Sequence, residues 1–439
     1  MDGPGPLLLF PYPKSNNRLR WLHVASAEDL ILLRAAAGKV VRSTDALLSP
    51  GVFSNRLDRR YRCWRFRDGR KAWSKFRRRA ISLLGNRHHS AMYRTDIAGY
   101  YPSVDIGRLR SLLKKCGCLG HGSKVILKIF REWQLREELQ GIPIGPEVSA
   151  VIGNFFLSPL KNILETNGLQ HLRWSDDILT FGPTTSNCEH SIAVIDEVLS
   201  ELRLTRSRAK TLRFDNVFDA RNNVDDYLLT SLTELFKENE DGNATNAVRR
   251  AFDVQLVNNP KVDPRRFRWI IRTLLNKHDP YGCRSLARAP SLMNVDPILA
   301  GQYLAEVALS GKRLKDTGVV DAILRRLSAP AEDQFDGLDL HLLNAVRRRG
   351  FGDAEAKEFR SLATDVARRW PIRIYAWAAY IKSTQRYSEL MEAATEEKIP
   401  QLRRGMIASL KGQSTRSFLT HARANFPESR YVADWLQAA

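Results

Sequence analysis

The chain has 439 residues, 43% of them hydrophobic, which is enough for two to four domains with buried cores. Five cysteines, two of them in a CxC, exclude a disulfide framework and a complete zinc site. With no apparent signal peptide and no apolar run of transmembrane length, we expect a soluble, cytoplasmic protein without a membrane partner. The formal charge of +21 favours a polyanionic partner, most often nucleic acid.

A basic segment dominates the first part of the chain. Residues 56–80, RLDRRYRCWRFRDGRKAWSKFRRRA, contain twelve Lys or Arg and two Asp, with five aromatic residues between them. Such a pattern suits a surface that neutralises phosphates and stacks on bases. The alternative is a helix with its aromatic residues in the core and its cations in water. The candidate nucleic-acid contacts are Arg56, Arg59, Arg60, Arg62, Arg65, Arg67, Lys71 and Lys75.

Residues 88–215 predict a mixture of helices and strands. AMYRTDI reads as a strand, and residues 123–139 have the apolar spacing of a helix. A Gly/Pro-rich turn at 141–146 precedes an apolar helix, and RWSDDILTF resembles a β-hairpin before another helix, SIAVIDEVLSELRL.

The composition changes after about residue 225. Strand signals disappear, and short helical patterns recur with polar breaks up to the end of the chain. This recurrence suits a loose α-solenoid of HEAT-like character, although a non-repetitive helical bundle fits as well. We expect the domain boundary near 215–235. The arginines along these helices predict a further contact with nucleic acid, and the alternative is that they only solvate the outer helix faces.

Two adjacent carboxylates, Asp176 and Asp177, interrupt an apolar run where a strand would be buried. Like charges at this spacing repel unless a cation compensates them, so the choice is between a solvent-facing turn and a metal site. Asp96 supplies a third carboxylate at the end of the strand that precedes the hairpin. A strand end beside a hairpin can hold two Mg²⁺ ions, with Mn²⁺ as a substitute, for nucleotidyl transfer.

Four segments in order resemble motifs A to D of the reverse transcriptase palm: DIAGYYPSV, GIPIGPEVSAVIGNFFLSPL, RWSDDILTF and ELRLTRSRAKT. The resemblance extends upstream and covers roughly residues 10–215. It implies an α+β, right-hand polymerase fold with basic fingers at 1–90 and a palm at 91–220. An all-α helical-repeat domain at 225–439 would replace or extend the thumb.

The resemblance also implies roles for individual residues. Asp96, Asp176 and Asp177 match the catalytic metal-binding triad, and the Ile97 carbonyl matches a further metal ligand. Lys210 lies where the family carries a lysine that protonates the leaving pyrophosphate. The expected dNTP contacts are Arg20, Lys14, Pro143, Gly145 and Tyr101, the last at the position of an aromatic steric gate. The alternative for Tyr101 is a core tyrosine, and for the cations a solvated surface charge.

Two positions depart from the common family pattern. Trp174 replaces the usual tyrosine before the aspartate pair, and Ile144 stands where a nucleotide-contacting glutamine is usual. With the helical C-terminal half, these features look more like the abortive-infection and defence-associated reverse transcriptases of bacteria. We therefore expect an RNA-directed DNA polymerase that acts in antiphage defence. It would use dNTPs and an RNA template, and its product would be DNA.

Three alternatives stay open. The enzyme could synthesise DNA without a template or from a protein primer, or it could be a retron reverse transcriptase with a dedicated noncoding RNA. In the third, a catalytically idle, basic RNA-binding scaffold keeps the polymerase fold. Self-association into a homo-oligomer is compatible with each of them.

Overall fold

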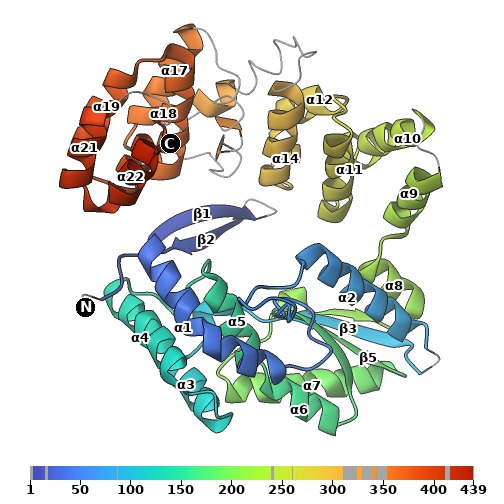
Figure 1. The fold of residues 1–439 in the computed structure, drawn as a ribbon. Helices are drawn as coiled ribbons and strands as arrows, with labels where there is room; N and C mark the ends of the chain where they lie inside the picture. Colours follow the sequence, from blue (N-terminus) through green and yellow to red (C-terminus); the bar gives the residue numbers. More distant parts are fainter. Residues whose placement is uncertain are drawn as a thin grey trace. The chain divides into compact units, whose positions relative to one another are not determined.

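The structure is a computed structural model that describes residues 3–14, 18–86, 88–238, 242–259, 261–309, 324–328, 339–340, 342–343, 353–410 and 416–438. It mixes helices with two small sheets, and helices predominate (Figure 1). The chain divides into two compact units. The first comprises Met1–Phe10 and Trp21–Ser231, and the second comprises Pro11–Arg20 and Leu232–Ala439.

A four-stranded antiparallel sheet lies at the centre of the first unit. Its strand order is β4-β5-β3-β6, with β4 at Gln170–Trp174, β5 at Asp177–Gly182, β3 at Ala91–Asp96 and β6 at Leu212–Phe214. The expected strand and hairpin are therefore present, and the hairpin pairs directly with the strand through β5 and β3. A smaller two-stranded sheet pairs β1, Leu8–Lys14, with β2, Arg18–Val24.

Helices cover both faces of the four-stranded sheet, so successive residues of β5 enter different cores. Ile178 packs with the larger core, whereas Leu179 and Phe181 pack with the smaller one beneath α2. This explains why RWSDDILTF is apolar on both sides of its aspartates. The helices are α1 Ala27–Ala46, α2 Gly69–Leu84, α3 Ile106–Lys115, α4 His121–Arg136, α5 Glu147–Phe156, α6 Pro159–Thr166, α7 Thr185–Glu201 and α8 Val217–Val224.

The apolar helix expected after the Gly/Pro turn is in fact two helices, α5 and α6. The break falls before Pro159, the first residue of α6. Proline has no backbone N–H, and its ring clashes with the carbonyl four residues earlier, so it starts a helix readily and interrupts one.

Beyond Phe214 the described residues form helices and no strand, as the sequence predicted for the C-terminal half. A single apolar cluster joins the helices of the second unit, with Phe267, Tyr303, Phe359 and Trp377 among its buried members. The clustered helices are α10 Gly242–Phe252, α11 Pro264–Asn276, α12 Cys283–Arg288, α13 Pro290–Met293, α14 Pro297–Tyr303, α17 Asp353–Thr364, α18 Trp370–Thr384, α19 Tyr387–Glu396, α20 Pro400–Ala408, α21 Arg416–Asn425 and α22 Arg430–Ala438. A further helix, α9 Tyr227–Glu238, begins in the first unit and ends in the second. Among the described helices, none combines the length and the apolar character needed to cross a membrane.

Candidate active site

Two of the expected catalytic carboxylates face each other across the sheet. In the register of β3 and β5, Asp96 is the direct partner of Asp177. Directly opposite residues of an antiparallel pair have Cα atoms about 4.5–5.5 Å apart, which brings their side chains together on one face. Both side chains are partly exposed, so the pair lies at the edge of the core where a ligand can reach it.

Asp176 lies in the turn of the hairpin that carries Asp177. The turn consists of Ser175 and Asp176, because Trp174 already pairs with Asp177. Asp176 is half-buried, and its charge raises the pKa of the buried Tyr100 hydroxyl, although burial is the larger cause of that shift. The third expected carboxylate is therefore next to Asp177 in the chain, in the turn that joins β4 to β5.

Each carboxylate of the facing pair has a cation of the chain beside it. Lys210 Nζ lies 2.7 Å from Asp96 Oδ1. Arg94 holds Asp177 through two bonds, with Nε 3.1 Å from Oδ1 and Nη2 2.6 Å from Oδ2. The two cations offset the repulsion that the facing aspartates would otherwise exert on each other.

Backbone pairing brings Lys210 to Asp96. The loop after α7 runs beside the end of β3, where Ser207 N–H donates to the Asp96 carbonyl at 2.7 Å and Ala98 N–H donates to the Thr205 carbonyl at 2.8 Å. The short helix η2, Arg208–Lys210, follows at once. Lys210, expected from the resemblance alone, is thus held in contact with the expected catalytic aspartate.

The donor set suits divalent cations, since carboxylate oxygens are the ligands that Mg²⁺ prefers. Asp96 Oδ1 is buried and has no hydrogen bond, because the nearby Lys210 ammonium forms an ion pair without hydrogen-bonding geometry. In the described part of the chain, however, no three His, Cys, Asp or Glu side chains come close enough to hold a metal ion. A metal ion would be held by Asp96, Asp176 and Asp177. For this, the side chains of Lys210 and Arg94 would have to move away from the carboxylates that they now contact.

Ile97 was expected to supply a backbone carbonyl to the metal. Its side chain is buried in the larger core, and its backbone forms an isolated antiparallel bridge with Arg206. The core side chain and the bridge therefore fix the residue that follows Asp96.

Tyr101 and the Gly/Pro turn meet although 40 residues separate them in the chain. Ile142 N–H donates to the Tyr101 carbonyl at 3.0 Å, and Gly141 adopts a positive φ of 66° at the contact. The Tyr101 ring is half-buried and packs against α5 at Gly153. Of the other expected dNTP contacts in this turn, Pro143 is buried and Gly145 is exposed.

Sequence reasoning missed a partner of this turn, His23 at the end of β2. His23 N–H donates to the Ile144 carbonyl at 2.6 Å, and Ile144 N–H donates to His23 Nδ1 at 3.0 Å. Burial lowers the pKa of His23, which keeps the ring neutral and Nδ1 available as an acceptor. No sequence signal marks this pairing, because its partners are 121 residues apart.

Arg94 was missed as well, although the strand pattern contains a signal for it. In a strand, residues two apart share a face, so Arg94 is bound to lie on the same face as Asp96. Two other expected residues, Lys14 and Arg20, belong to the segment Pro11–Arg20 of the second unit. Lys14 ends β1, and its side chain lies outside the described part of the structure.

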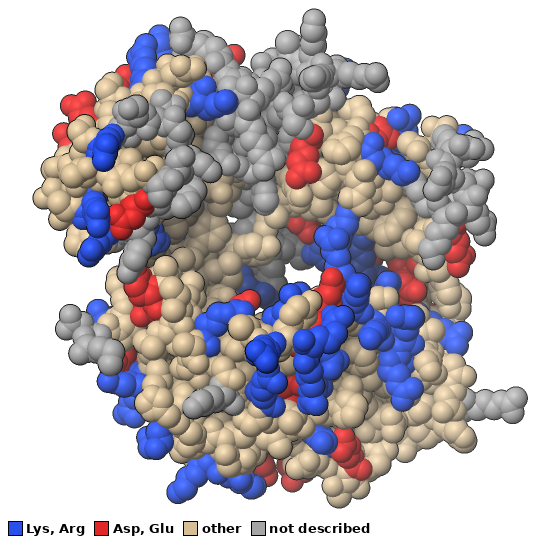
Figure 2. Space-filling view, viewed as in Figure 1, with Lys and Arg blue, Asp and Glu red and all other residues tan. Residues whose placement is uncertain are grey.

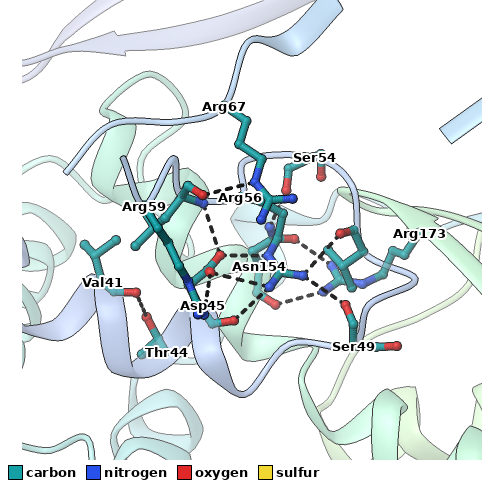
Figure 3. A network of polar contacts seen from close by, with 12 residues as sticks. Val41, Thr44, Asp45, Ser49, Ser54, Arg56, Arg59, Arg67, Asn154 and Arg173 are labelled. Carbon is teal, nitrogen blue, oxygen red and sulfur yellow. Dashed lines mark hydrogen bonds and ion pairs between the residues drawn. The ribbon is translucent and has the colours of Figure 1, made fainter. Parts of the chain in front are cut away.

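The basic segment divides into one buried arginine and a set of exposed cations. Arg56 is only 9% exposed, and its guanidinium bonds Asp45 together with the carbonyls of Ser49 and Val52 (Figure 3). A buried guanidinium with these partners has no surface to offer a phosphate, so we assign Arg56 a structural role in place of the expected nucleic-acid contact.

Arg77 is half-buried and pairs with Asp225 at 2.7 Å. The remaining cations of the segment are exposed, and Figure 2 shows Lys and Arg side chains gathered over α2 and the loop before it. Two of them also pair with carboxylates: Arg60 with Asp58 at 2.5 Å and Arg59 with Asp45 at 3.8 Å. The exposed candidates are Arg59, Arg60, Arg62, Arg65, Arg67, Lys71 and Lys75.

Some aromatic residues of the segment lie in the core and others lie at the surface, so each of the two interpretations of the segment applies to part of them. Trp64 and Phe76 are buried in the two cores, whereas Tyr61 and Trp73 remain partly exposed. Trp73 packs edge-on against Trp174, with ring centroids 4.9 Å apart. Trp174 therefore anchors α2 to the hairpin.

No protein-family model matches the chain, and no curated protein matches it significantly. Its function is therefore inferred from the motifs and from the arrangement of the residues that carry them.

Proposed function

We propose that the first unit is a nucleotidyltransferase of the reverse transcriptase kind, an RNA-directed DNA polymerase that uses dNTPs. The observation that supports this most is the register of β3 and β5, which sets Asp96 opposite Asp177, with Asp176 in the turn between β4 and β5. The contact of Lys210 with Asp96 adds a proton donor to the same place.

The chain's own residues divide the work as follows. Asp96, Asp176 and Asp177 would hold Mg²⁺, which when bound lowers the pKa of the primer hydroxyl and neutralises phosphate charge. The Lys210 ammonium, released from Asp96, can neutralise or protonate the leaving pyrophosphate. Tyr101 and the Gly/Pro turn form one wall together, and a ring at that wall disfavours a ribose 2′-hydroxyl.

The role in antiphage defence and the HEAT-like character of the second unit belong to the same proposal. Both rest on the sequence resemblance and on the succession of short helices in the second unit. Templated copying of RNA is preferred here over untemplated or protein-primed synthesis, and the experiment below separates them.

A second candidate is the idle RNA-binding scaffold, and one observation favours it. The cations of Lys210 and Arg94 already neutralise Asp96 and Asp177, an arrangement that is stable without metal. The exposed cations around α2 would serve such a scaffold equally well.

The test is incorporation of labelled dNTPs by the purified full chain with Mg²⁺, with and without prior RNase treatment. Asp96→Asn and Asp176→Asn should each lower the rate at least about a hundred-fold, because metal-held charge stabilisation contributes several kcal/mol and each 1.36 kcal/mol is a factor of ten. Asp215→Asn is the matched control, since Asp215 is an exposed, arginine-paired aspartate just after β6.

Product that is lost after RNase treatment supports copying of an RNA. Product that resists RNase indicates untemplated synthesis, and product that migrates with the protein indicates a protein primer. If neither dNTPs nor NTPs are incorporated by the wild-type chain while RNA still binds, the scaffold replaces the polymerase.

A further inference from the structure

The turn that carries Asp176 has an unusual backbone. Ser175 adopts a positive φ of 59°, in the left-handed region that side chains disfavour. A serine in this conformation needs support from surrounding groups, because the two-residue turn offers little of its own. Any change in this residue would re-aim the carboxylate that follows it.

Both backbone polar groups of Ser175 are held by side chains. Its N–H donates to the Ser54 hydroxyl oxygen at 2.6 Å, and its carbonyl accepts from Arg173 Nη1 at 2.8 Å. Ser54 comes from the loop between α1 and α2, 121 residues earlier in the chain. The conformation of the turn therefore depends on a segment outside the hairpin.

Asn154 of α5 links these two side chains. Its Oδ1 accepts from Arg173 Nη1 at 2.9 Å, its carbonyl accepts from Arg173 Nη2 at 3.0 Å, and its Nδ2 donates to the Ser54 carbonyl at 2.7 Å (Figure 3). Exposed fractions are 3% for Ser54, 4% for Asn154 and 2% for Arg173. Ser54, Asn154 and Arg173 thus form a closed, buried network, here called the hairpin clamp.

The loop before α2 is also paired with the hairpin along its backbone. Phe53 N–H donates to the Arg173 carbonyl at 3.1 Å, and Arg173 N–H donates to the Gly51 carbonyl at 2.8 Å. These two bonds fix the position of Ser54 along the hairpin, next to the turn. Burial lowers the pKa of Arg173 to about 10, which still leaves the guanidinium charged at neutral pH beneath Asp176.

We propose that Ser54, Asn154 and Arg173 are positioning residues that hold the Ser175 backbone and thereby aim the Asp176 carboxylate. Their effect on catalysis rests on the proposed function, whereas their hold on the turn does not. Two members of the network, Ser54 and Arg173, bond the backbone of Ser175 directly, so the network acts on this turn and does more than stabilise the fold. The clamp also couples the basic loop to the candidate active site, because one loop residue bonds the turn directly.

The test compares Ser54→Ala with Ser123→Ala in the full chain. Ser123 is a fully buried serine of α4 whose hydroxyl donates to the Cys118 and Gly120 carbonyls and to no residue of the hairpin. Amide hydrogen exchange of the hairpin should accelerate at least about tenfold at Ser175 in Ser54→Ala and remain unchanged in Ser123→Ala. Arg173→Lys, which keeps the charge but loses the forked donor, should accelerate it as well.

Steady-state incorporation of dNTPs gives the second readout. Ser54→Ala should lower kcat about tenfold with little change in the KM for dNTP, and Ser123→Ala should leave both within twofold. Equal exchange at Ser175 in the two serine variants would overturn the clamp. Faster exchange with an unchanged kcat would overturn its positioning role. If the wild-type chain does not polymerise, the proposed function fails, and exchange alone still decides the hold on the turn.

Discussion

At the scale of single residues, the candidate site is a balance of carboxylates and cations. Asp177 has both oxygens engaged by Arg94, a side chain of which about a third is exposed. A divalent cation that binds Asp177 must displace or share this guanidinium. We therefore expect Arg94 to lower the affinity of the proposed metal site, while its ion pair with Asp177 stabilises the metal-free fold.

Replacing Arg94 should strengthen metal binding. We expect Arg94→Gln to bind Mn²⁺ about fivefold more tightly, equivalent to about 1 kcal/mol for a partly exposed, bidentate ion pair. Titration of the full chain followed by electron paramagnetic resonance measures the affinity without any need for activity. Arg213→Gln is the control, because Arg213 pairs with Asp215 and Glu189 at an exposed place on the same unit. Equal Mn²⁺ affinity in the two variants would remove Arg94 as a competitor.

At the scale of elements, the loop at Tyr101 and the Gly/Pro turn at Gly141 approach each other closely. A Cβ atom on Gly141 would overlap the carbonyl oxygen of Tyr101. The glycine is therefore required twice, once for its positive φ and once for the contact between the turn and the 3₁₀-helix η1, Tyr101–Ser103.

A pair of glycine variants separates these two requirements. Gly168 has a φ of 65° but nothing within 4 Å of an added Cβ, so Gly168→Ala carries the backbone cost alone, about 1 kcal/mol. Gly141→Ala adds the clash and should cost about 2–4 kcal/mol of unfolding free energy. Urea denaturation followed by tryptophan fluorescence measures the difference. A similar loss in both variants would mean that the two loops separate easily.

At the scale of the whole molecule, the chain has 69 basic and 48 acidic residues, a formal net charge of +21. This charge is compatible with folding because many of the cations are paired with carboxylates. Arg206 with Asp196, Arg249 with Asp279 and Arg373 with Glu397 are examples from both units. The exposed cations of the loop before α2 and of α2 carry the unbalanced charge that a polyanion would meet.

The pH dependence of stability should reflect buried histidine. Burial is the main cause that lowers the pKa of His171 below its ordinary value of 6.5, with the nearby Arg173 charge as a second cause. Below pH 6.5 the unfolded chain binds a proton that the folded chain does not, so this contribution to stability is present above pH 6.5 and is lost as the pH falls.

The loss is at most about 1.4 kcal/mol per pH unit for one histidine. Between pH 8 and pH 5.5 the free energy of unfolding should decrease less in His171→Gln than in the wild-type chain. His88→Gln, at an exposed position, should keep the wild-type slope. An unchanged slope in His171→Gln would show that His171 is protonated in the folded chain.

The sequence by itself determined several elements of this protein. The apolar residues on both sides of Asp176 and Asp177 predicted the hairpin, the spacing in 123–139 predicted α4, and the loss of strand signals predicted the helices after Phe214. These features depend on neighbours within one or two turns of the chain, and so a single sequence contains them.

Only the tertiary structure decided which distant groups meet. Arg94 and Asp177 are 83 residues apart in the chain. Ser54 is 100 residues from Asn154 and 121 residues from Ser175. The burial of Arg56 likewise follows from its contact with Asp45, which its basic neighbours concealed in the sequence. Sequence pattern reports which side chains share a face, whereas the register of strands and the packing of helices select the partner across it.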